Sequence, residues 1–207
     1  ITKVRIVYET TNSYIRVSFV FSRASTMKLI IGLGNPGDEY IGTRHNVGRD
    51  LVRAYATEWM IQKKLYAEIA SYSHAQEKTL LVLPTTYMNE SGIAAQAILH
   101  YYKQGAQDLI LIHDDIDLPL GSLRIVERAG PGGHNGIASI QTTLGIKDII
   151  RIRIGVAGAT RSRTDAAKYV LAHFSKTEQR TMTVLNKIVT EVLDVIQELR
   201  DEGRDFI

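Results

Sequence analysis

Four short stretches of this chain hold polar side chains that could take part in acid–base chemistry. Each lies at the end of an apolar run that predicts a strand, and ligands of α/β proteins bind at the ends of such strands. The chain has no cysteine and no G-x-S-x-G motif, so a hydrolytic reaction here would have to use water. The stretches are Asn35 with His45 and Asn46, Tyr87-Met88-Asn89, His113-Asp114-Asp115 with Asp117, and Gly132-Gly133-His134-Asn135-Gly136.

Water needs a base near neutral pH, and histidine is the usual one. His45 is the candidate base. Asp114, at the end of a predicted strand, is the candidate carboxylate that fixes the tautomer of its ring and stabilises the imidazolium. Asparagine suits the other roles, because its amide donates to an oxyanion or accepts from a peptide N–H without bringing charge. Structural explanations stay open as well, since asparagines after strands form turns and His45 or His134 could simply be structural.

A glycine-rich turn follows the predicted strand that begins near Met27. Its residues Gly32-Leu-Gly34-Asn-Pro-Gly37 match the dinucleotide-binding pattern G-x-G-x-x-G, in which the last glycine opens a helix whose N-terminus holds a pyrophosphate. Here Pro36 disfavours helical backbone at Asn35. Glu58 has about the spacing of the ribose-binding acid but lies in a helical pattern. The context therefore argues against a dinucleotide site.

Three acidic residues, Asp114, Asp115 and Asp117, could instead bind a divalent cation, since oxygen ligands suit Mg²⁺ and Mn²⁺. The third acid lies beside Leu118-Pro119, however, and the chain has no H-E-x-x-H motif. We therefore expect no metal in the site, with a metal hydrolase as an alternative.

The composition predicts one domain with a mild positive charge. The 207 residues are 44% hydrophobic, which is enough for one sizeable core. A formal net charge of +3 and a pI of about 9.0 allow a polyanionic partner without requiring one. The absence of cysteine fits a reducing compartment, and no apolar run approaches the ~18 residues that a membrane span needs.

The stretch before Met27 differs from the rest of the chain. It begins without methionine and contains a β-branched run, Tyr14 to Phe21, with strand character but without the pattern of a signal peptide. Met27 then stands directly before an apolar strand. We expect residues 1–26 to be an extension that arises from cloning or from the assigned gene start, and residues 27–207 to form the domain.

From Met27 onward, apolar runs alternate with helical periodicity, and no linker or internal repeat divides them. This order predicts a single α/β domain with a twisted, mixed and largely parallel sheet and helices on both faces. Ser175 and Glu178 form a capping box before the last helix. The expected strands are 28–33, 66–72, 78–84, 109–113, 121–127 and 150–156, and the expected helices are 47–64, 91–103, a short one ending at Leu144 and a long one from 175 to about 199.

Five motifs in order along the chain point to one family. They are Gly32-Leu-Gly-Asn-Pro-Gly37 with Tyr40 and Thr43-Arg-His-Asn46; Pro84-Thr-Thr-Tyr-Met-Asn89 with Ser91-Gly92; His113-Asp114-Asp115-x-Asp117-Leu-Pro119; Gly132-Gly-His-Asn-Gly136; and Arg151-Ile-Arg-Ile-Gly155. Each motif alone is weak, but together they resemble bacterial-type peptidyl-tRNA hydrolase. The resemblance runs from Met27 to the C-terminus with comparable spacing between the motifs.

The resemblance implies a hydrolase without metal or cofactor that usually acts as a cytoplasmic monomer. Such an enzyme cleaves the ester between a peptide and the terminal ribose of tRNA, which returns the tRNA to translation. By motif match, His45 would be the general base that activates water, and Asp114 would hold it in place.

The same resemblance implies which residues surround the substrate. Asn35 and Asn89 would bind the peptide end and the reacting carbonyl, with Asn89 as a plausible oxyanion donor. Asn135 would position water and the substrate backbone, while Tyr40 and Met88 would shape the cleft near the tRNA end. Hydrogen bonding to the first peptide N–H would exclude aminoacyl-tRNA, because its free ammonium cannot make the same contacts.

Recognition of all elongator tRNAs must rest on charge and shape. In the family, a pair of basic residues binds the tRNA 5′-phosphate. Arg153 matches one member of the pair, but the other member falls near Val126, so Arg124 or Arg128 would have to replace it. The loop Ala129-Gly-Pro-Gly also carries a proline that many relatives lack.

Three other classes of protein remain as alternatives. An RNA-binding protein that has kept the fold and lost turnover would bind tRNA without cleaving it. A nucleotide-dependent oxidoreductase would carry bound NAD or flavin, and a metal hydrolase would lose activity in EDTA. The presence of His45, Asp114 and the three asparagines argues against the first of these.

Overall fold

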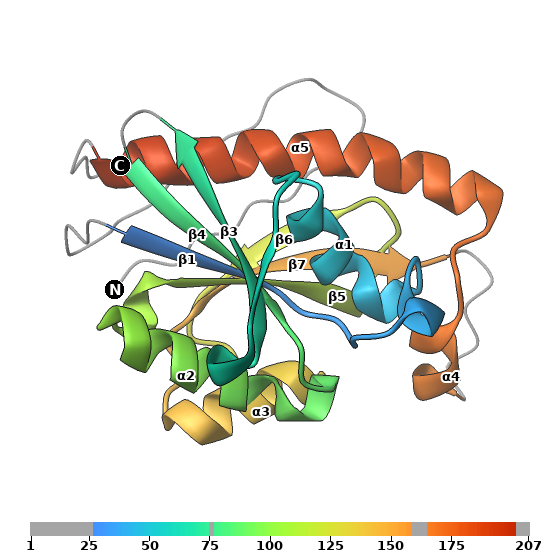
Figure 1. Ribbon diagram of the computed structural model, residues 1–207. Helices are drawn as coiled ribbons and strands as arrows, with labels where there is room; N and C mark the ends of the chain where they lie inside the picture. Colours follow the sequence, from blue (N-terminus) through green and yellow to red (C-terminus); the bar gives the residue numbers. More distant parts are fainter. Residues whose placement is uncertain (1–26, 75–76, 159–164, 202–207) are drawn as a thin grey trace.

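The computed structural model describes residues 27–74, 77–158 and 165–201, and within them a seven-stranded β-sheet crosses the molecule (Figure 1). The extension expected at 1–26, with its strand-like run, lies outside the described residues. The strands are β1 (Met27–Gly32), β2 (Met60–Gln62), β3 (Ala67–His74), β4 (Glu77–Pro84), β5 (Leu109–Pro119), β6 (Leu123–Val126) and β7 (Ile150–Ala157), in the spatial order β2-β3-β4-β1-β5-β7-β6.

The centre of the sheet is parallel. Strands β4, β1, β5 and β7 run in the same direction, β3 and β6 pair antiparallel with the two outer members of this group, and β2 pairs antiparallel with β3. Strands β1 and β5 contain continuous apolar runs because both of their faces are covered, whereas β7 alternates isoleucine with arginine along its first half. In β1, Leu29 and Ile31 pack on one side and Ile30 on the other, each at most 1% exposed. The predicted mixed, largely parallel sheet is confirmed.

Helices cover both faces of this sheet (Figure 1). They are α1 (Val47–Arg53), α2 (Ser91–Tyr102), α3 (Asn135–Leu144), α4 (Ala166–Leu171) and α5 (Lys176–Asp201). On one face, α1 and α5 contribute Val52 and Leu185 to a core shared with the strands. On the other face, α2 and α3 contribute Ile98 and Ile137. The prediction of helices on both faces is confirmed.

The first helix is much shorter than expected. Residues 47–64 have helical periodicity, but α1 ends at Arg53, and Met60–Gln62 forms the edge strand β2. Tyr55 and Trp59, which suggested the longer helix, still pack against the core. Pairing with the free edge of β3 has therefore overridden the local pattern, as tertiary context often does for short segments.

Strand β5 is longer than its apolar run, and this places the acidic residues. The run predicted an end at His113, whereas β5 continues to Pro119. Its pairing with β7 is regular as far as Asp115 and shifts only beyond it. Asp114 and Asp115 are thus held by the backbone hydrogen bonds of the sheet and do not lie in a loop, because the neighbouring strand extends the pairing past the apolar residues.

One helix was not expected from periodicity. α4 begins after Asp165, whose Oδ1 accepts a hydrogen bond from the backbone N–H of Lys168 at 3.0 Å. It is short, so few of its positions could show a pattern. Among the described helices, none is both long and apolar enough to span a membrane.

Candidate active site

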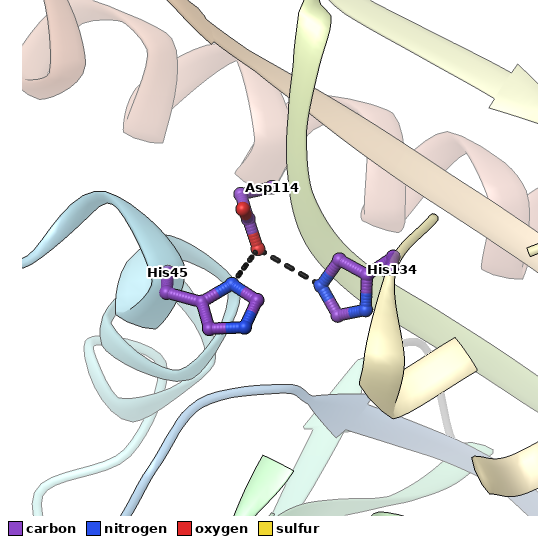
Figure 2. A group of neighbouring side chains, drawn as sticks. All are labelled: His45, Asp114 and His134. Atoms are coloured by element: carbon purple, nitrogen blue, oxygen red, sulfur yellow. Dashed lines mark hydrogen bonds and ion pairs between the residues drawn. The ribbon is translucent and has the colours of Figure 1, made fainter. Parts of the chain in front are cut away.

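Two histidines meet one carboxylate in β5 (Figure 2). Asp114 is 3% exposed, and its Oδ1 lies 2.9 Å from Nδ1 of His45 and 2.9 Å from Nε2 of His134. Both rings point at this oxygen. His45 comes from a 3₁₀ turn, η2 (Arg44–Asn46), that leads into α1, and His134 directly precedes α3. The structure thus brings His45 and Asp114 together as expected and adds His134, whose role the sequence had left open.

The hydrogen bonds determine which ring nitrogens carry protons. An ionised carboxylate only accepts, so His45 Nδ1 and His134 Nε2 both donate to Asp114. His134 Nδ1 accepts from the backbone N–H of Ile137 at 3.3 Å, which agrees with a neutral ring. In neutral His45, Nε2 then carries the lone pair. This nitrogen lies on the side of the ring away from Asp114 and has no partner within the described residues (Figure 2), so it can accept a proton.

Asp114 is charged although it is buried. Burial by itself raises the pKa of a carboxyl, but the nearby His134 and the hydrogen bonds from His134 and His45 outweigh it and hold the pKa of Asp114 well below its usual 3.8. A third ring, that of His113, lies with its centroid 4.6 Å from that of His134. Burial, and next His134, lower the pKa of His113 well below 6.5. The site therefore holds a negative charge next to His45, together with a neutral His113.

His45 reaches Asp114 because residue 48 is glycine. A Cβ on Gly48 would lie 2.1 Å from the carbonyl oxygen of Ile112, far closer than Cβ atoms come to backbone. The same carbonyl accepts from the N–H of Leu33 at 2.9 Å, and the carbonyl of Leu33 accepts from the N–H of Arg49 at 2.9 Å. The turn after β1, the start of α1 and strand β5 are thereby tied together.

The residue before the base is anchored on the C-terminal part of the described chain. The guanidinium of Arg44 donates to the carbonyls of Ala172 and His173 at 3.1 and 3.0 Å, and to both carboxylate oxygens of Glu178 at 3.1 and 3.0 Å. Nη2 makes both contacts to Glu178 and Nη1 makes both contacts to the carbonyls, and the hydrogen bonds to the carboxylate are charge-assisted and therefore stronger than neutral ones. His45 is therefore positioned both by the packing of α1 on β5 and by contacts far along the chain.

Two asparagines form a closed pair beside the base. The N–H of Asn35 donates to Oδ1 of Asn46 at 2.8 Å, and Nδ2 of Asn46 donates back to the carbonyl of Asn35 at 2.9 Å. Oδ1 of Asn35 accepts from the N–H of Met88 at 2.8 Å. Within the described residues, Nδ2 of Asn35 has no partner, so it is available as a donor. The side chain of Asn46 is 1% exposed, and both of its hydrogen bonds are to the backbone of Asn35.

The start of α3 packs closely on Met88. A Cβ on Gly136 would lie 2.5 Å from Sδ of Met88 and 3.1 Å from Cε1 of His134, so glycine is needed for this contact. Met88 is buried, whereas Asn89, next in the 3₁₀ turn η4 (Met88–Glu90), is exposed and has no hydrogen bond within the described residues. Met88 thus packs in the interior against the start of α3, whereas the side chain of Asn89 lies on the surface.

A cavity of about 360 Å³ opens over the carboxylate. Strands β5 and β7, helix α4 and the glycine-rich loop before α3 form its walls. The predicted site residues that line it are His45, Asp114, Asn135 and Arg153. Arg151 also lines it and is 2% exposed. Sequence patterns did not identify Arg151 as a site residue, although the alternation of arginine and isoleucine in β7 is a signal that two arginines share one face.

The other predicted residues do not line this cavity. Tyr40 is half-buried in the turn after β1. Arg124 lies in β6 directly opposite Arg153 in β7. Arg128 is exposed, has left-handed backbone with φ 54° and places its Nε 3.3 Å from the carboxylate of Asp148.

The acidic cluster proposed for a cation is not assembled. Asp115 accepts a hydrogen bond from the N–H of Asp117 at 2.8 Å and pairs with an arginine. Among the described residues, the potential ligand atoms of His45, Asp114 and His134 all lie within 4.8 Å of one another. A metal hydrolase would therefore have to use these three groups and replace the protons that the histidines share with Asp114.

A parallel sheet with a histidine–carboxylate pair in a cavity near its strand ends is the arrangement of an α/β enzyme that uses acid–base chemistry. Comparisons with known proteins define it further. A family model described as peptidyl-tRNA hydrolase matches residues 29–206. Peptidyl-tRNA hydrolases of Syntrophotalea carbinolica and Rickettsia bellii are 40% identical over 173 residues and 46% identical over 156 residues, covering 82% and 73% of this chain and 90% and 83% of those proteins.

The structural comparison agrees. A crystal structure of peptidyl-tRNA hydrolase from Acinetobacter baumannii matches with a TM-score of 0.77 at 29% identity and covers 88% of this chain and 95% of that one. The chain belongs to the peptidyl-tRNA hydrolase family. The resemblance drawn from the five motifs is confirmed.

Proposed function

We propose that this member of the peptidyl-tRNA hydrolase family cleaves its substrate with water activated by His45, without metal or cofactor. The bond broken is the ester between a peptide, or an N-blocked amino acid, and the terminal ribose of tRNA. The observation that carries the proposal is the 2.9 Å contact between His45 Nδ1 and Asp114 Oδ1. This contact directs the lone pair of the other ring nitrogen away from the carboxylate.

In the proposed reaction, Nε2 of His45 takes a proton from water while the water oxygen attacks the ester carbonyl. The charge of Asp114 stabilises the imidazolium that forms. The tetrahedral intermediate then collapses, the bond to the ribose oxygen breaks, and His45 returns its proton to that oxygen. The oxygen of water stays on the peptide as part of its carboxylate, and tRNA leaves with a free hydroxyl.

Amide side chains are proposed to hold the peptide end. Asn35 offers its unpartnered Nδ2, and Asn135 lines the cavity wall, where it can position water. Asn89, exposed beside the buried Met88, is the proposed oxyanion donor, a role worth roughly 10²- to 10³-fold in turnover. Tyr40 and Met88 are proposed to shape the cleft near the tRNA end.

The tRNA 5′-phosphate is proposed to bind Arg153 together with Arg124. Their positions are paired across β6 and β7, and side chains at paired positions leave the sheet on the same face, which favours Arg124 over Arg128. A phosphate would compete with Asp115, which already pairs with Arg153. We propose that the enzyme acts as a monomer in the cytoplasm, where peptidyl-tRNA arises.

The test is release of N-acetyl-amino acid from N-acetyl-aminoacyl-tRNA in EDTA, beside unblocked aminoacyl-tRNA. We expect wild type to cleave only the blocked substrate. His45→Ala should lower turnover by roughly 10²- to 10⁴-fold, the usual contribution of a positioned acid–base group, and keep tRNA binding. His100→Ala removes an exposed histidine of α2 and should keep wild-type turnover, so it is the matched control.

Several results would contradict the proposal. Unchanged turnover in His45→Ala would remove His45 from the mechanism, and loss of wild-type activity in EDTA would favour a bound metal. Binding of tRNA without cleavage by wild type would assign the chain to the RNA-binding class. The rate should also fall as pH decreases, because a protonated imidazole cannot accept the proton of water. A rate that is constant between about pH 5 and 8 would argue against a histidine base.

A further inference from the structure

Arg151 is a buried cation, and among the described residues the carboxylate whose charge acts on it, that of Asp115, is paired with Arg153. Arg151 lies in β7 on the cavity wall and is 2% exposed. Its Nη2 donates to the carbonyl of Gly130 at 3.1 Å, and its buried Nε has no hydrogen-bond partner. Within the described residues it forms no ion pair. Burial of an unpaired charge is unfavourable, so a ligand that brings negative charge would satisfy this side chain.

The neighbouring arginine, Arg153, does have an ion-pair partner. Arg153 pairs through its Nε with Oδ2 of Asp115, and the charge of Asp114 is already occupied by two histidine donors. Burial, and next Arg153, lower the pKa of Arg151 to about 10, so it is still protonated at neutral pH. Asp115 also acts on Arg151 through its charge but pairs directly with Arg153, so two arginines share one carboxylate. Within the described residues, the positive charge that is left without an ion-pair partner on the β7 side of the cavity is that of Arg151.

His113, which lines the same cavity, holds a second buried polar atom that has no partner within the described residues. Nδ1 of His113 is 2.7 Å from the carbonyl oxygen of Asp114, and because a carbonyl only accepts, Nδ1 carries the proton. Nε2 of His113 then has a lone pair, and it is buried with no hydrogen bond. The charge of Arg151 acts on this ring, so the two groups are near each other. Together they offer a hydroxyl acceptor and a cation.

These groups lie about one nucleotide away from the reacting centre. In the pairing of β5 with β7, Ile154 lies opposite Asp114 and Arg151 lies opposite Leu111. Arg151 is therefore three positions back along the strands, about 10 Å at ~3.3 Å per residue, and both residues line the same cavity. In peptidyl-tRNA, the ester is on the terminal ribose. The nearest phosphate of the tRNA is the phosphodiester on the 5′ side of the same ribose, which also carries a free hydroxyl.

We propose that Arg151 binds the phosphodiester of the 3′-terminal nucleotide of tRNA, and that His113 accepts a hydrogen bond from the ribose of that nucleotide. The proposal rests on the proposed function, and it deepens it by assigning a subsite for the nucleotide that carries the ester. This phosphate is different from the 5′-phosphate assigned to Arg153 and Arg124. The cavity would then recognise the phosphate and the ribose of the nucleotide as well as the ester that it carries.

A binding experiment tests the subsite without any need for turnover. NMR titrations compare adenosine with adenosine 5′-monophosphate, which differ only in the phosphate, for wild type, Arg151→Gln and Arg53→Gln. Arg53 lies on α1 outside the cavity, and its side chain is 42% exposed. Arg53→Gln is therefore the matched control for the loss of an arginine. Wild type and Arg53→Gln should bind the monophosphate roughly 10- to 100-fold more tightly, the range for hydrogen bonds to charged groups. Arg151→Gln should bind both probes alike.

Adenosine binding by Arg151→Gln at wild-type affinity shows that the variant is folded. Arg151→Lys keeps the charge but not the planar fork of donors, and it should restore part of the preference. Equal affinity of wild type for the two probes, or an unchanged preference in Arg151→Gln, would overturn the proposal. Neither result would bear on whether the protein hydrolyses peptidyl-tRNA.

Turnover then identifies which phosphate is bound. N-acetyl-aminoacyl esters of adenosine and of the dinucleotide cytidylyl-adenosine both lack a tRNA 5′ end, and only the second has the phosphodiester. Arg151→Gln should lower kcat/KM for the dinucleotide ester roughly 10- to 100-fold and leave the adenosine ester unchanged. An effect confined to full-length tRNA would assign Arg151 to another phosphate. An equal loss on all substrates would reduce Arg151 to a structural role, and either result would overturn the proposal.

Discussion

A single carboxylate oxygen sets the geometry of the base. Oδ1 of Asp114 accepts from His45 and from His134, and His134 is itself fixed, because its other nitrogen accepts from the first turn of α3. His134 can therefore hold the carboxylate in the orientation that His45 needs. We propose that it acts on His45 through Asp114, as a positioning residue.

The lowered pKa of Asp114 predicts a dependence of stability on pH. A carboxyl whose pKa is lower in the folded than in the unfolded state stabilises the fold above its unfolded pKa, and this contribution is lost as the pH falls. We expect Asp114→Asn to be less stable than wild type by about 1–3 kcal/mol at pH 5. The difference should shrink towards pH 3, because the unfolded carboxyl then binds a proton. Denaturant unfolding of both proteins at pH 5, 4 and 3 measures this.

The range from pH 5 to pH 3 lies below the titration of histidines in the unfolded chain, where the pKa of a histidine is about 6.5. A difference between the two proteins that stays constant from pH 5 to pH 3 would show that Asp114 has no lowered pKa. His100→Ala, used as the control for turnover, should follow wild type over the whole range.

At the scale of secondary structure, the site depends on how closely α1 approaches β5. Gly48 lies against the carbonyl of Ile112, and a methyl group there would meet backbone atoms that cannot move away. The two elements carry His45 and Asp114. A small change in their separation would therefore lengthen the contact between base and carboxylate as well as loosen the core.

We expect Gly48→Ala to lower the free energy of unfolding by at least about 2 kcal/mol, because overpacking forces backbone to shift. Its turnover per folded molecule should also fall, since His45 moves with α1. Urea unfolding and active-site-normalised kinetics measure the two effects. Gly130→Ala is the matched control for stability, because a Cβ there meets nothing within 4 Å. Equal stability of the two variants would contradict the packing argument.

At the scale of the whole molecule, two distant parts of the chain are joined next to the base. Arg44 binds the segment before α5 and Glu178 within α5, and its guanidinium lies 4.4 Å above the ring of Tyr169. Thr43 forms an isolated bridge with His173. The C-terminal helix thus contributes to the site without touching it, by fixing the turn from which His45 projects.

We expect Arg44→Lys to lose about 1.5–3 kcal/mol of stability, because lysine cannot donate to both oxygens of Glu178 and to two carbonyls at once. Its turnover should fall although His45 and Asp114 are intact. Arg53→Lys changes a more exposed pair with Glu68 and should cost no more than about 1 kcal/mol. Thermal unfolding and kinetics of both variants provide the comparison. Arg44→Lys with wild-type turnover would show that this anchor does not position the base.

The sheet could be predicted from the sequence because its central strands are buried on both faces. Leu29 to Ile31 and Leu109 to Ile112 form continuous apolar runs that indicate such strands directly. The edge strand at Met60–Gln62 could not be predicted in this way, because it exists only through pairing with β3. Helix α4 has too few residues to show a period, and its start depends on a cap at Asp165.

For the site, the sequence indicated the pairing of His45 with Asp114, because Asp114 directly follows the expected strand 109–113 and His45 lies in the loop after the expected strand 28–33. The ends of such strands meet at one edge of an α/β sheet. The placement of His134 on the same oxygen depends on the packing of α3 and could not be derived from spacing. The same holds for Arg151, because what distinguishes it is the absence of a carboxylate partner among the described residues. The roles of Tyr40, Asn89 and the arginines remain predictions.

The anchoring of Arg44 has a consequence for the time at which the enzyme becomes active. Its partners Ala172, His173 and Glu178 follow it by 128, 129 and 134 residues, so a ribosome makes His45 long before it makes the residues that steady it. Domains fold progressively as they are synthesised. During that interval the growing polypeptide is itself a peptidyl-tRNA, joined to its tRNA by the kind of ester that this family hydrolyses. Under the proposed mechanism, we therefore expect the order of residues along the chain to delay the assembly of the site during the enzyme's own translation.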